Sequence, residues 1–215
     1  MNQRTRIKIC GVSREADIAA AVEAGADAVG LVFHPGSPRF VTAERAAQLT
    51  RTLPPYVTPV GLFVNAAQAE VERILALVPA LVLQFHGDES PEACNAFGRP
   101  YLRAARMAPG FDLLDFARRF SEAQGLLLDA HVEAFGGSGK VFDWSLVPRG
   151  VPHRLVLSGG LHAGNVGSGI RELRPWAVDV SSGVESARGV KDAAAIHAFC
   201  DAVREADLRI EASVS

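Results

Sequence analysis

Two side chains in this sequence combine proton-transfer chemistry with a position at the end of an apolar run. Cys10 ends the run RIKIC, and Asp129 follows three leucines in the run GLLLDA. A thiolate accepts a proton, and a carboxyl group that is partly removed from water favours the protonated form that can donate one. A buried apolar cysteine and a helix-capping or salt-bridged aspartate are the structural alternatives. As a base at neutral pH, Cys10 needs a lowered pKa, and nearby helix N-termini or Arg39 are the expected cause.

Two short turns that are rich in serine and glycine form the expected phosphate site. Glycine lets backbone N–H groups approach an anion closely, and a helix N-terminus adds a favourable dipole. Ordinary turn chemistry explains either turn alone, but two such turns after neighbouring strands favour a phosphate site. The expected binding residues are Gly159, Gly160, Ser181, Ser182 and Gly183. The run GGSG at 136–139 lacks the spacing of a nucleotide-binding P-loop and predicts no nucleotide.

Three further polar side chains are candidates for binding a substrate. Arg39 lies in a proline-containing turn, where its guanidinium suits bidentate capture of a carboxylate; a solvated surface charge is the alternative. His86 ends another strand-like run, and Asp179 has a setting like that of Asp129, with bracing of the 181–182 turn as the alternative. The six histidines are scattered without an HxH or HExxH motif, so no metal site is expected.

The elements that position these residues alternate along the chain. Short apolar runs predict eight strands, at residues 6–10, 27–33, 57–64, 80–86, 101–107, 125–130, 153–160 and 176–183. Between and after them, Ala-, Glu- and Arg-rich segments predict helices at 13–25, 42–53, 66–78, from Ser90, at 111–120, 163–173 and 191–207. This alternation is typical of parallel α/β sheets and predicts a single (βα)8 TIM barrel, with residues 1–215 as one domain. An open, doubly wound sheet is the alternative.

In such a barrel, function collects at the C-terminal ends of the strands. Every candidate residue ends or follows a predicted strand, so we expect all of them to meet at one rim. The glycine-rich run at 135–140 follows the sixth strand and is expected to be a mobile loop that closes over the site.

The composition excludes several function classes. The net charge of −2 and a pI of about 6.3 favour neither nucleic acid nor an anionic membrane as a partner. Three widely spaced cysteines indicate a reducing compartment without disulfides, and no apolar run is long enough for a signal peptide or a transmembrane helix. We therefore expect a cytoplasmic protein. The oligomeric state, monomer or homodimer, is left open.

Several segments resemble the phosphoribosylanthranilate isomerase family, in the family's order and across residues 7–192. They are KICG (8–11), GADAVGLVFHPGSPRFV (25–41), VGLFVN (60–65), LQFHGDE (83–89), LLLDA (126–130), GGSGKVFDW (136–144), LSGGLHAGNV (157–166) and VDVSSGVES (178–186). The sequence departs from the family at Phe85, where leucine is common, and at His162 and Ala163, where proline or asparagine is frequent. Neither departure touches a candidate residue.

The resemblance implies an Amadori rearrangement of an aminoaldose, with no cofactor. It assigns Cys10 as general base, Asp129 as general acid, Arg39 to the anthranilate carboxylate and the two glycine-containing turns to the phosphate of a phosphosugar substrate. Asp179 becomes a polar active-site residue. The alternatives are the histidine-pathway isomerase, which is expected to use two aspartates, indoleglycerol phosphate synthase, and a non-catalytic phosphosugar-binding protein on the same scaffold.

Overall fold

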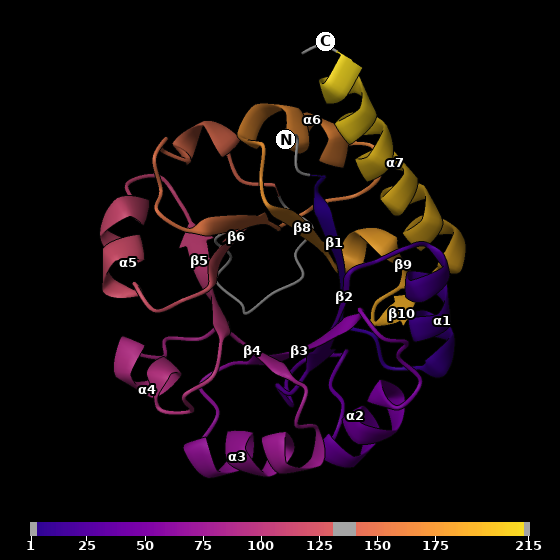
Figure 1. Cartoon of the computed structure of the whole chain (residues 1–215), viewed down its shortest axis with the longest axis vertical. Helices are drawn as coiled ribbons and strands as arrows, with labels where there is room; N and C mark the ends of the chain where they lie inside the picture. Colours follow the sequence, from indigo (N-terminus) through magenta and orange to yellow (C-terminus); the bar gives the residue numbers. More distant parts are fainter. Residues whose placement is uncertain (1–3, 131–140, 213–215) are drawn as a thin grey trace.

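Eight parallel strands close into a barrel in the computed structural model of the chain, which describes residues 4–130 and 141–212. Each strand pairs with the next along the chain and β8 pairs with β1, so the ring has no open edge (Figure 1). This confirms the predicted barrel and excludes the open sheet. The strands are β1 (Arg6–Cys10), β2 (Ala28–Val32), β3 (Thr58–Phe63), β4 (Val82–Phe85), β5 (Tyr101–Met107), β6 (Gly125–Ala130), β7 (Arg154–Leu157) and β8 (Ala177–Val180).

Helices surround the strands on the outside of the barrel (Figure 1). They are α1 (Glu15–Glu23), α2 (Ala43–Thr50), α3 (Gln68–Leu77), α4 (Pro91–Asn95), α5 (Leu113–Arg119), α6 (Val166–Leu173) and α7 (Ala193–Ala212). Between β6 and β7 the described residues form one short 3-10 turn, η1 (Trp144–Leu146). The run at 135–140, expected to be a mobile loop, lies outside the described residues.

The alternation of side chains along each strand sorts them into two layers. In β1, Ile7 and Ile9 join the large apolar core between strands and helices, so Lys8 and Cys10 face the barrel interior. A small separate cluster lies inside, formed by register neighbours of four consecutive strands: Ala104, Leu127, Val156 and Ala177. The interior therefore combines apolar side chains with charged and polar groups such as Lys8 and Cys10.

A hairpin that the sequence analysis did not predict follows β8. A 3-10 turn, η2 (Ser182–Val184), leads into β9 (Glu185–Ala187), which pairs antiparallel with β10 (Val190–Lys191). Gly189, at φ +81°, approaches the Pro38 carbonyl so closely that a Cβ would lie 2.7 Å from its oxygen. The hairpin is therefore seated against the turn that carries Arg39.

The last helix ties the two ends of the described chain together. The Asp207 carboxylate of α7 accepts hydrogen bonds from the backbone N–H and the hydroxyl of Thr5, both at 2.7 Å. Figure 1 shows α7 beside α1 on the outside of the barrel. Among the helices that the described residues form, none combines the length and the apolar character needed to cross a membrane.

Candidate active site

Cys10 is buried at the C-terminal end of β1, on the face turned toward the barrel interior. Its register partner on β2 is Gly30, and a Cβ there would lie 2.7 Å from Cys10 Sγ and 3.1 Å from Lys8 Nζ. The missing side chain of Gly30 therefore leaves the space in which the thiol and the ammonium group lie close together.

Lys8 and Asp179 form an ion pair inside the barrel. Lys8 Nζ donates to Asp179 Oδ1 at 2.8 Å, and the two side chains are only 5% and 6% exposed. Burial lowers the pKa of Lys8, but the Asp179 carboxylate and the Cys10 thiol raise it more, so the pKa lies above its ordinary value and Lys8 stays charged. Ser158 Oγ donates to the second Asp179 oxygen at 3.3 Å. Asp179 thus holds the Lys8 ammonium group next to Cys10 and also accepts a hydrogen bond from Ser158. The sequence analysis had offered bracing of the 181–182 turn as the alternative role for Asp179.

The electrostatic setting of Cys10 differs from the expectation. Burial raises the pKa of the thiol, the Lys8 ammonium lowers it, Asp179 raises it and Lys191 lowers it, so the net pKa lies above the ordinary thiol value. The expected lowering by Arg39 is wrong, because two lysines are the cations that favour the thiolate. Burial therefore disfavours the thiolate form of Cys10 in the protein without substrate.

Asp129 ends the interior face of β6 and is held by two hydrogen bonds. His86 Nε2 lies 3.0 Å from Asp129 Oδ2, and the Ala130 N–H donates to Oδ1 at 2.9 Å. Gln84 Nε2 lies 3.3 Å from His86 Nδ1, so with the amide assigned as donor the imidazole carries its proton on Nε2 and donates to Asp129. His86, which is expected to bind substrate, therefore contacts the candidate acid.

Arg39 is a buried residue, and the alternative of a solvated surface charge is wrong. Its Nε and Nη2 donate to the two carboxylate oxygens of Glu185 at 2.6 and 2.8 Å. This bidentate pair occupies one edge of the planar guanidinium and leaves the Nη1/Nη2 edge for a ligand. A Cβ at Gly11, which has φ +78°, would overlap the aliphatic part of the Arg39 side chain. Because glycine has no Cβ, Arg39 can lie against the backbone directly after Cys10.

Glu185 joins Arg39 to a second buried cation. Lys191 Nζ lies 2.8 Å from Glu185 Oε1 and donates to the Ser181 carbonyl at 2.9 Å. Burial raises the pKa of Glu185, but Arg39 and Lys191 lower it more, which brings it to about 2. The β9–β10 hairpin thereby fixes Arg39 from one side and the turn after β8 from the other.

The two glycine-containing turns after β7 and β8 lie in direct contact. Gly183 approaches the Leu161 carbonyl so closely that any Cβ would overlap its oxygen. Gly159 and Gly160 both have positive φ, at +77° and +65°. Within the described residues, the N–H groups of Gly159, Gly160, Ser182 and Gly183 have no acceptor, so they can donate to the oxygens of an anion. A Cβ at Gly159 would lie 2.8 Å from Asp129 Oδ1, which places this turn beside the candidate acid.

The structure brings every candidate residue to the C-terminal rim and adds four that the sequence analysis missed: Lys8, Gln84, Glu185 and Lys191. Lys8 could have been found, because it stands two residues before Cys10 on a buried strand and so shares its face. Gln84 stands in the same relation to His86. Glu185 and Lys191 had no such signal, since they reach the site through the unpredicted hairpin. Among the described residues, no group of three or more His, Cys, Asp or Glu side chains is placed to hold a metal ion.

A closed parallel barrel with a buried thiol, a positioned carboxyl group and paired glycine-containing turns after β7 and β8 is typical of barrel enzymes that bind phosphate and transfer protons. The model of the N-(5'phosphoribosyl)anthranilate (PRA) isomerase family matches residues 7–202. The chain belongs to this family.

Individual relatives agree with the family match. An N-(5'-phosphoribosyl)anthranilate isomerase of Methylibium petroleiphilum is 69% identical over 210 residues, covering 98% of this chain and 99% of the relative. The crystal structure of phosphoribosyl anthranilate isomerase from Thermus thermophilus is 34% identical with a TM-score of 0.85, covering 94% of this chain and 99% of that one. A further phosphoribosyl anthranilate isomerase, solved in complex with reduced 1-(o-carboxyphenylamino)-1-deoxyribulose 5-phosphate, is 37% identical with a TM-score of 0.79 and covers 94% and 99%.

Proposed function

We propose that this chain converts N-(5′-phosphoribosyl)anthranilate to 1-(o-carboxyphenylamino)-1-deoxyribulose 5-phosphate, an Amadori rearrangement of tryptophan biosynthesis, with Asp129 as acid and Cys10 as base. The family match and the relative bound to the reduced product support the reaction. The assignment of each residue rests on the geometry of the rim.

The order of the groups around the rim carries this proposal. Arg39 lies against the end of β1 beside Cys10, the two glycine-containing turns follow β8 and β7, and Asp129 on β6 contacts the Gly159 turn. These strands are consecutive around the barrel. The substrate has its carboxylate at one end, its phosphate at the other and the reacting ring carbons between them, so a substrate anchored at both ends presents C2 to Cys10 and the ring oxygen to Asp129.

Asp129 opens the sugar ring in the proposed mechanism. The protonated carboxyl group donates its proton to the furanose ring oxygen, the bond from that oxygen to C1 breaks, and the substrate nitrogen supplies the electron pair that forms a C1 iminium. His86 holds the Asp129 carboxyl group in orientation through the 3.0 Å contact, and the Gly159 turn sets its distance from the phosphate end.

Cys10 then removes the proton from C2. The positive iminium acidifies this proton, and the electron pair of the C–H bond forms a C1=C2 double bond while the nitrogen becomes neutral. The resulting enolamine loses its O2 proton and gains one at C1, which yields the ketose. Lys8 and Lys191 stabilise the Cys10 thiolate against the cost of burial. Over one turnover Asp129 loses a proton and Cys10 gains one, and proton exchange with solvent restores both groups.

The binding residues hold the two ends of the substrate. The Nη1/Nη2 edge of Arg39 pairs with the anthranilate carboxylate, while Glu185 keeps the opposite edge fixed. The N–H groups of Gly159, Gly160, Ser182 and Gly183 cradle the phosphate. Ser181 is held through its carbonyl by Lys191, which fixes the turn from behind.

The test follows the fluorescence of phosphoribosylanthranilate, generated in the assay, as purified protein is added. We expect rapid loss of fluorescence with the wild type and a loss at least about a hundredfold slower with Asp129→Asn, which keeps shape and removes the acid. The matched control Asp192→Asn removes an aspartate that caps the start of α7 and leaves the rate near that of the wild type. Binding of the substrate without turnover favours the non-catalytic phosphosugar-binding alternative.

We also infer that residues 1–215 act as one domain in the cytoplasm. The single closed barrel and the contact of Thr5 with Asp207 support one domain. The three cysteines are unpaired and buried, which suits a reducing compartment.

A further inference from the structure

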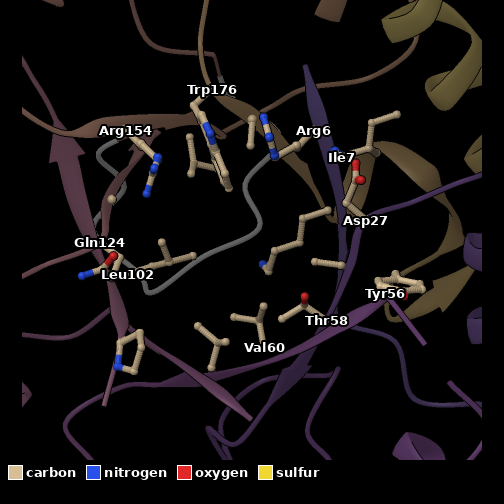
Figure 2. A pocket seen from close by; sticks show the side chains of 17 residues that line it. Arg6, Ile7, Asp27, Tyr56, Thr58, Val60, Leu102, Gln124, Arg154 and Trp176 are labelled. Atoms are coloured by element: carbon tan, nitrogen blue, oxygen red, sulfur yellow. Dashed lines mark hydrogen bonds between the residues drawn. The ribbon is translucent and has the colours of Figure 1, made fainter. Parts of the chain in front are cut away.

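Gln84 places a buried amide in the middle of the barrel interior. It is fully buried on β4, between Val82, which lines a cavity at the N-terminal ends of the strands, and His86 at the C-terminal rim. Its register partners are Leu62 on β3 and Leu102 on β5, and Figure 2 shows Leu102 beside that cavity. Neither leucine side chain can form a hydrogen bond. A buried amide lowers stability unless it is hydrogen-bonded, so an apolar residue would be the expected choice here.

Within the described residues, the Gln84 amide makes one side-chain contact, and that contact is with His86. Gln84 Nε2 lies 3.3 Å from His86 Nδ1, while Gln84 Oε1 is buried without a hydrogen-bond partner among the described residues. Buried polar atoms almost always have partners, and the exceptions concentrate where a residue has a function. The contact with His86 is therefore the reason for an amide at this position.

The backbone around His86 is fixed by other residues. Arg103 donates from Nη1 to the Phe85 carbonyl at 2.9 Å and from Nη2 to the Gly87 carbonyl at 3.0 Å, on either side of His86. The His86 N–H donates to the Phe63 carbonyl at 2.8 Å. These contacts hold the chain on which the ring is mounted, but none of them determines which ring nitrogen carries the proton. The groups that face the two nitrogens determine that.

Gln84 faces Nδ1 of the His86 ring, and Asp129 faces Nε2. The hydrogen bond at one ring nitrogen sets the protonation of the other. If Gln84 Oε1 faced Nδ1, the imidazole proton would lie there, and the bare Nε2 would accept the acid proton of Asp129 and turn it away from the substrate. If Gln84 Nε2 donates to Nδ1, the imidazole proton lies on Nε2 and donates to Asp129 Oδ2 at 3.0 Å. The second arrangement leaves the acid proton of Asp129 for the substrate.

We propose that Gln84 is a positioning residue that holds His86 in the tautomer with its proton on Nε2, so that His86 donates a hydrogen bond to Asp129 throughout the reaction. This hydrogen bond strengthens as Asp129 gives up its proton and becomes negative, so it stabilises the transition state more than the ground state. Gln84 acts only through His86. The effect on the rate rests on the proposed function, whereas the tautomer is a property of the protein alone.

Long-range proton–nitrogen NMR correlation spectra of the isotope-labelled whole protein measure the tautomer directly. A protonated ring nitrogen and a bare one resonate far apart, and His86→Phe assigns the signals because those of His86 disappear. In the wild type we expect a protonated Nε2 and a bare Nδ1. Gln84→Glu keeps the shape but offers an acceptor, so we expect Nδ1 of His86 to become protonated. A wild-type ring with its proton on Nδ1, or a bare Nδ1 in Gln84→Glu, overturns the proposal.

Steady-state kinetics test the consequence for the rate. Gln84→Met keeps the shape and removes the donor, so we expect kcat to fall about tenfold, the weight of one hydrogen bond, with little change in KM. Gln124→Met is the matched control, because Gln124 is exposed at the opposite end of the barrel, beside the N-terminal cavity (Figure 2). It leaves both kcat and the tautomer of His86 unchanged.

A double-mutant cycle separates this role from simple packing. In the His86→Phe background, Gln84→Met causes no further loss of kcat, because the residue through which Gln84 acts is gone. Equal losses of kcat in both backgrounds, or a Gln84→Met protein with the kcat of the wild type, overturn the proposal. An inactive wild type whose His86 has its proton on Nε2 contradicts the proposed function instead, and supports the part of Gln84 in setting the tautomer.

Discussion

The Lys8 ammonium and the Asp179 carboxylate form a 2.8 Å ion pair inside the barrel, next to the Cys10 thiol. The pair places a cation beside a residue that must become an anion in order to accept a proton. The ion pair with Asp179 fixes the Lys8 ammonium group, and the absence of a side chain at Gly30 leaves room for it. The ammonium group therefore lies beside Cys10 without substrate. The net pKa of Cys10 nevertheless lies above the ordinary thiol value, since burial outweighs the two lysines.

This setting predicts a pH dependence with a definite sign. Activity needs the thiolate, so kcat/KM rises as the pH increases through the neutral range toward the raised pKa of Cys10. Lys8→Met removes a cation that lowers this pKa, so the rising limb moves to higher pH and kcat/KM at neutral pH falls about tenfold. The pH profile of kcat/KM checks this, with Arg51→Gln as a surface-charge control. A rising limb that stays in place in Lys8→Met refutes the role of Lys8.

His86 is predicted to act through Asp129. His86→Phe removes the Nε2 donor, so the Asp129 carboxyl group is no longer held toward the ring oxygen and kcat falls about tenfold to a hundredfold. KM changes little, because the ends of the substrate are bound elsewhere. Steady-state kinetics measure both constants, with His153→Gln as the control, since His153 contacts the Phe120 carbonyl away from the site. A raised KM with unchanged kcat means instead that His86 binds substrate.

Gly183 is predicted to tolerate no side chain. A Cβ there overlaps the Leu161 carbonyl, so Gly183→Ala forces the two glycine-containing turns apart and costs about 1–3 kcal/mol of stability. The KM rises and inhibition by inorganic phosphate weakens. Gly167→Ala on α6 is the matched control, because its Cβ would lie 3.4 Å from the nearest atom, and its helix gains up to about 1 kcal/mol. Thermal unfolding and inhibition by phosphate are measured for both variants. If Gly183→Ala and Gly167→Ala change these two properties equally, the predicted effect of the contact between Gly183 and Leu161 is contradicted.

Glu185 is predicted to make stability depend on acid pH. Its pKa in the folded protein is about 2, below the ordinary 4.5, so its contribution is complete above pH 4.5 and is lost as the pH falls toward 2. Glu185→Gln leaves Arg39 and Lys191 without their shared carboxylate and costs about 3 kcal/mol at neutral pH. Urea unfolding of the wild type and the variant at several pH values measures the difference. The difference narrows between pH 4.5 and pH 2, and a constant difference there contradicts the assignment.

The strands were the part of the fold that the sequence predicted best. Residues 6–10, 101–107 and 125–130 were predicted with the bounds that the structure has, because each is a short segment rich in apolar residues that is followed by a turn or loop. The run at 153–160 was predicted too long, since the two glycines at its end adopt positive φ and leave the sheet. Closure of the barrel depends on the pairing of β1 with β8, about 170 residues apart along the chain, which no local pattern contains.

The candidate site was predictable where strand ends determine it and not where a loop supplies it. Cys10 and Asp129 follow from the rule that parallel strands end at one rim. Burial of Arg39 depends on Glu185, which is 146 residues away and on a hairpin whose pairing only the folded chain shows. The neighbours that set the pKa of Cys10 were also predicted wrongly. Arg39 pairs with the Glu185 carboxylate, and Lys8 and Lys191 are the cations that lower the pKa of the thiol.

The rate of phosphoribosylanthranilate consumption by Cys10→Ala tests the central claim most directly. Cys200→Ala is the matched control, because Cys200 is also buried but lies in α7, away from the rim. We predict that Cys10→Ala remains folded, still binds inorganic phosphate, and loses at least about a hundredfold in kcat, while Cys200→Ala keeps a rate near that of the wild type. A Cys10→Ala protein with a rate close to that of the wild type contradicts the assignment of Cys10 as the base.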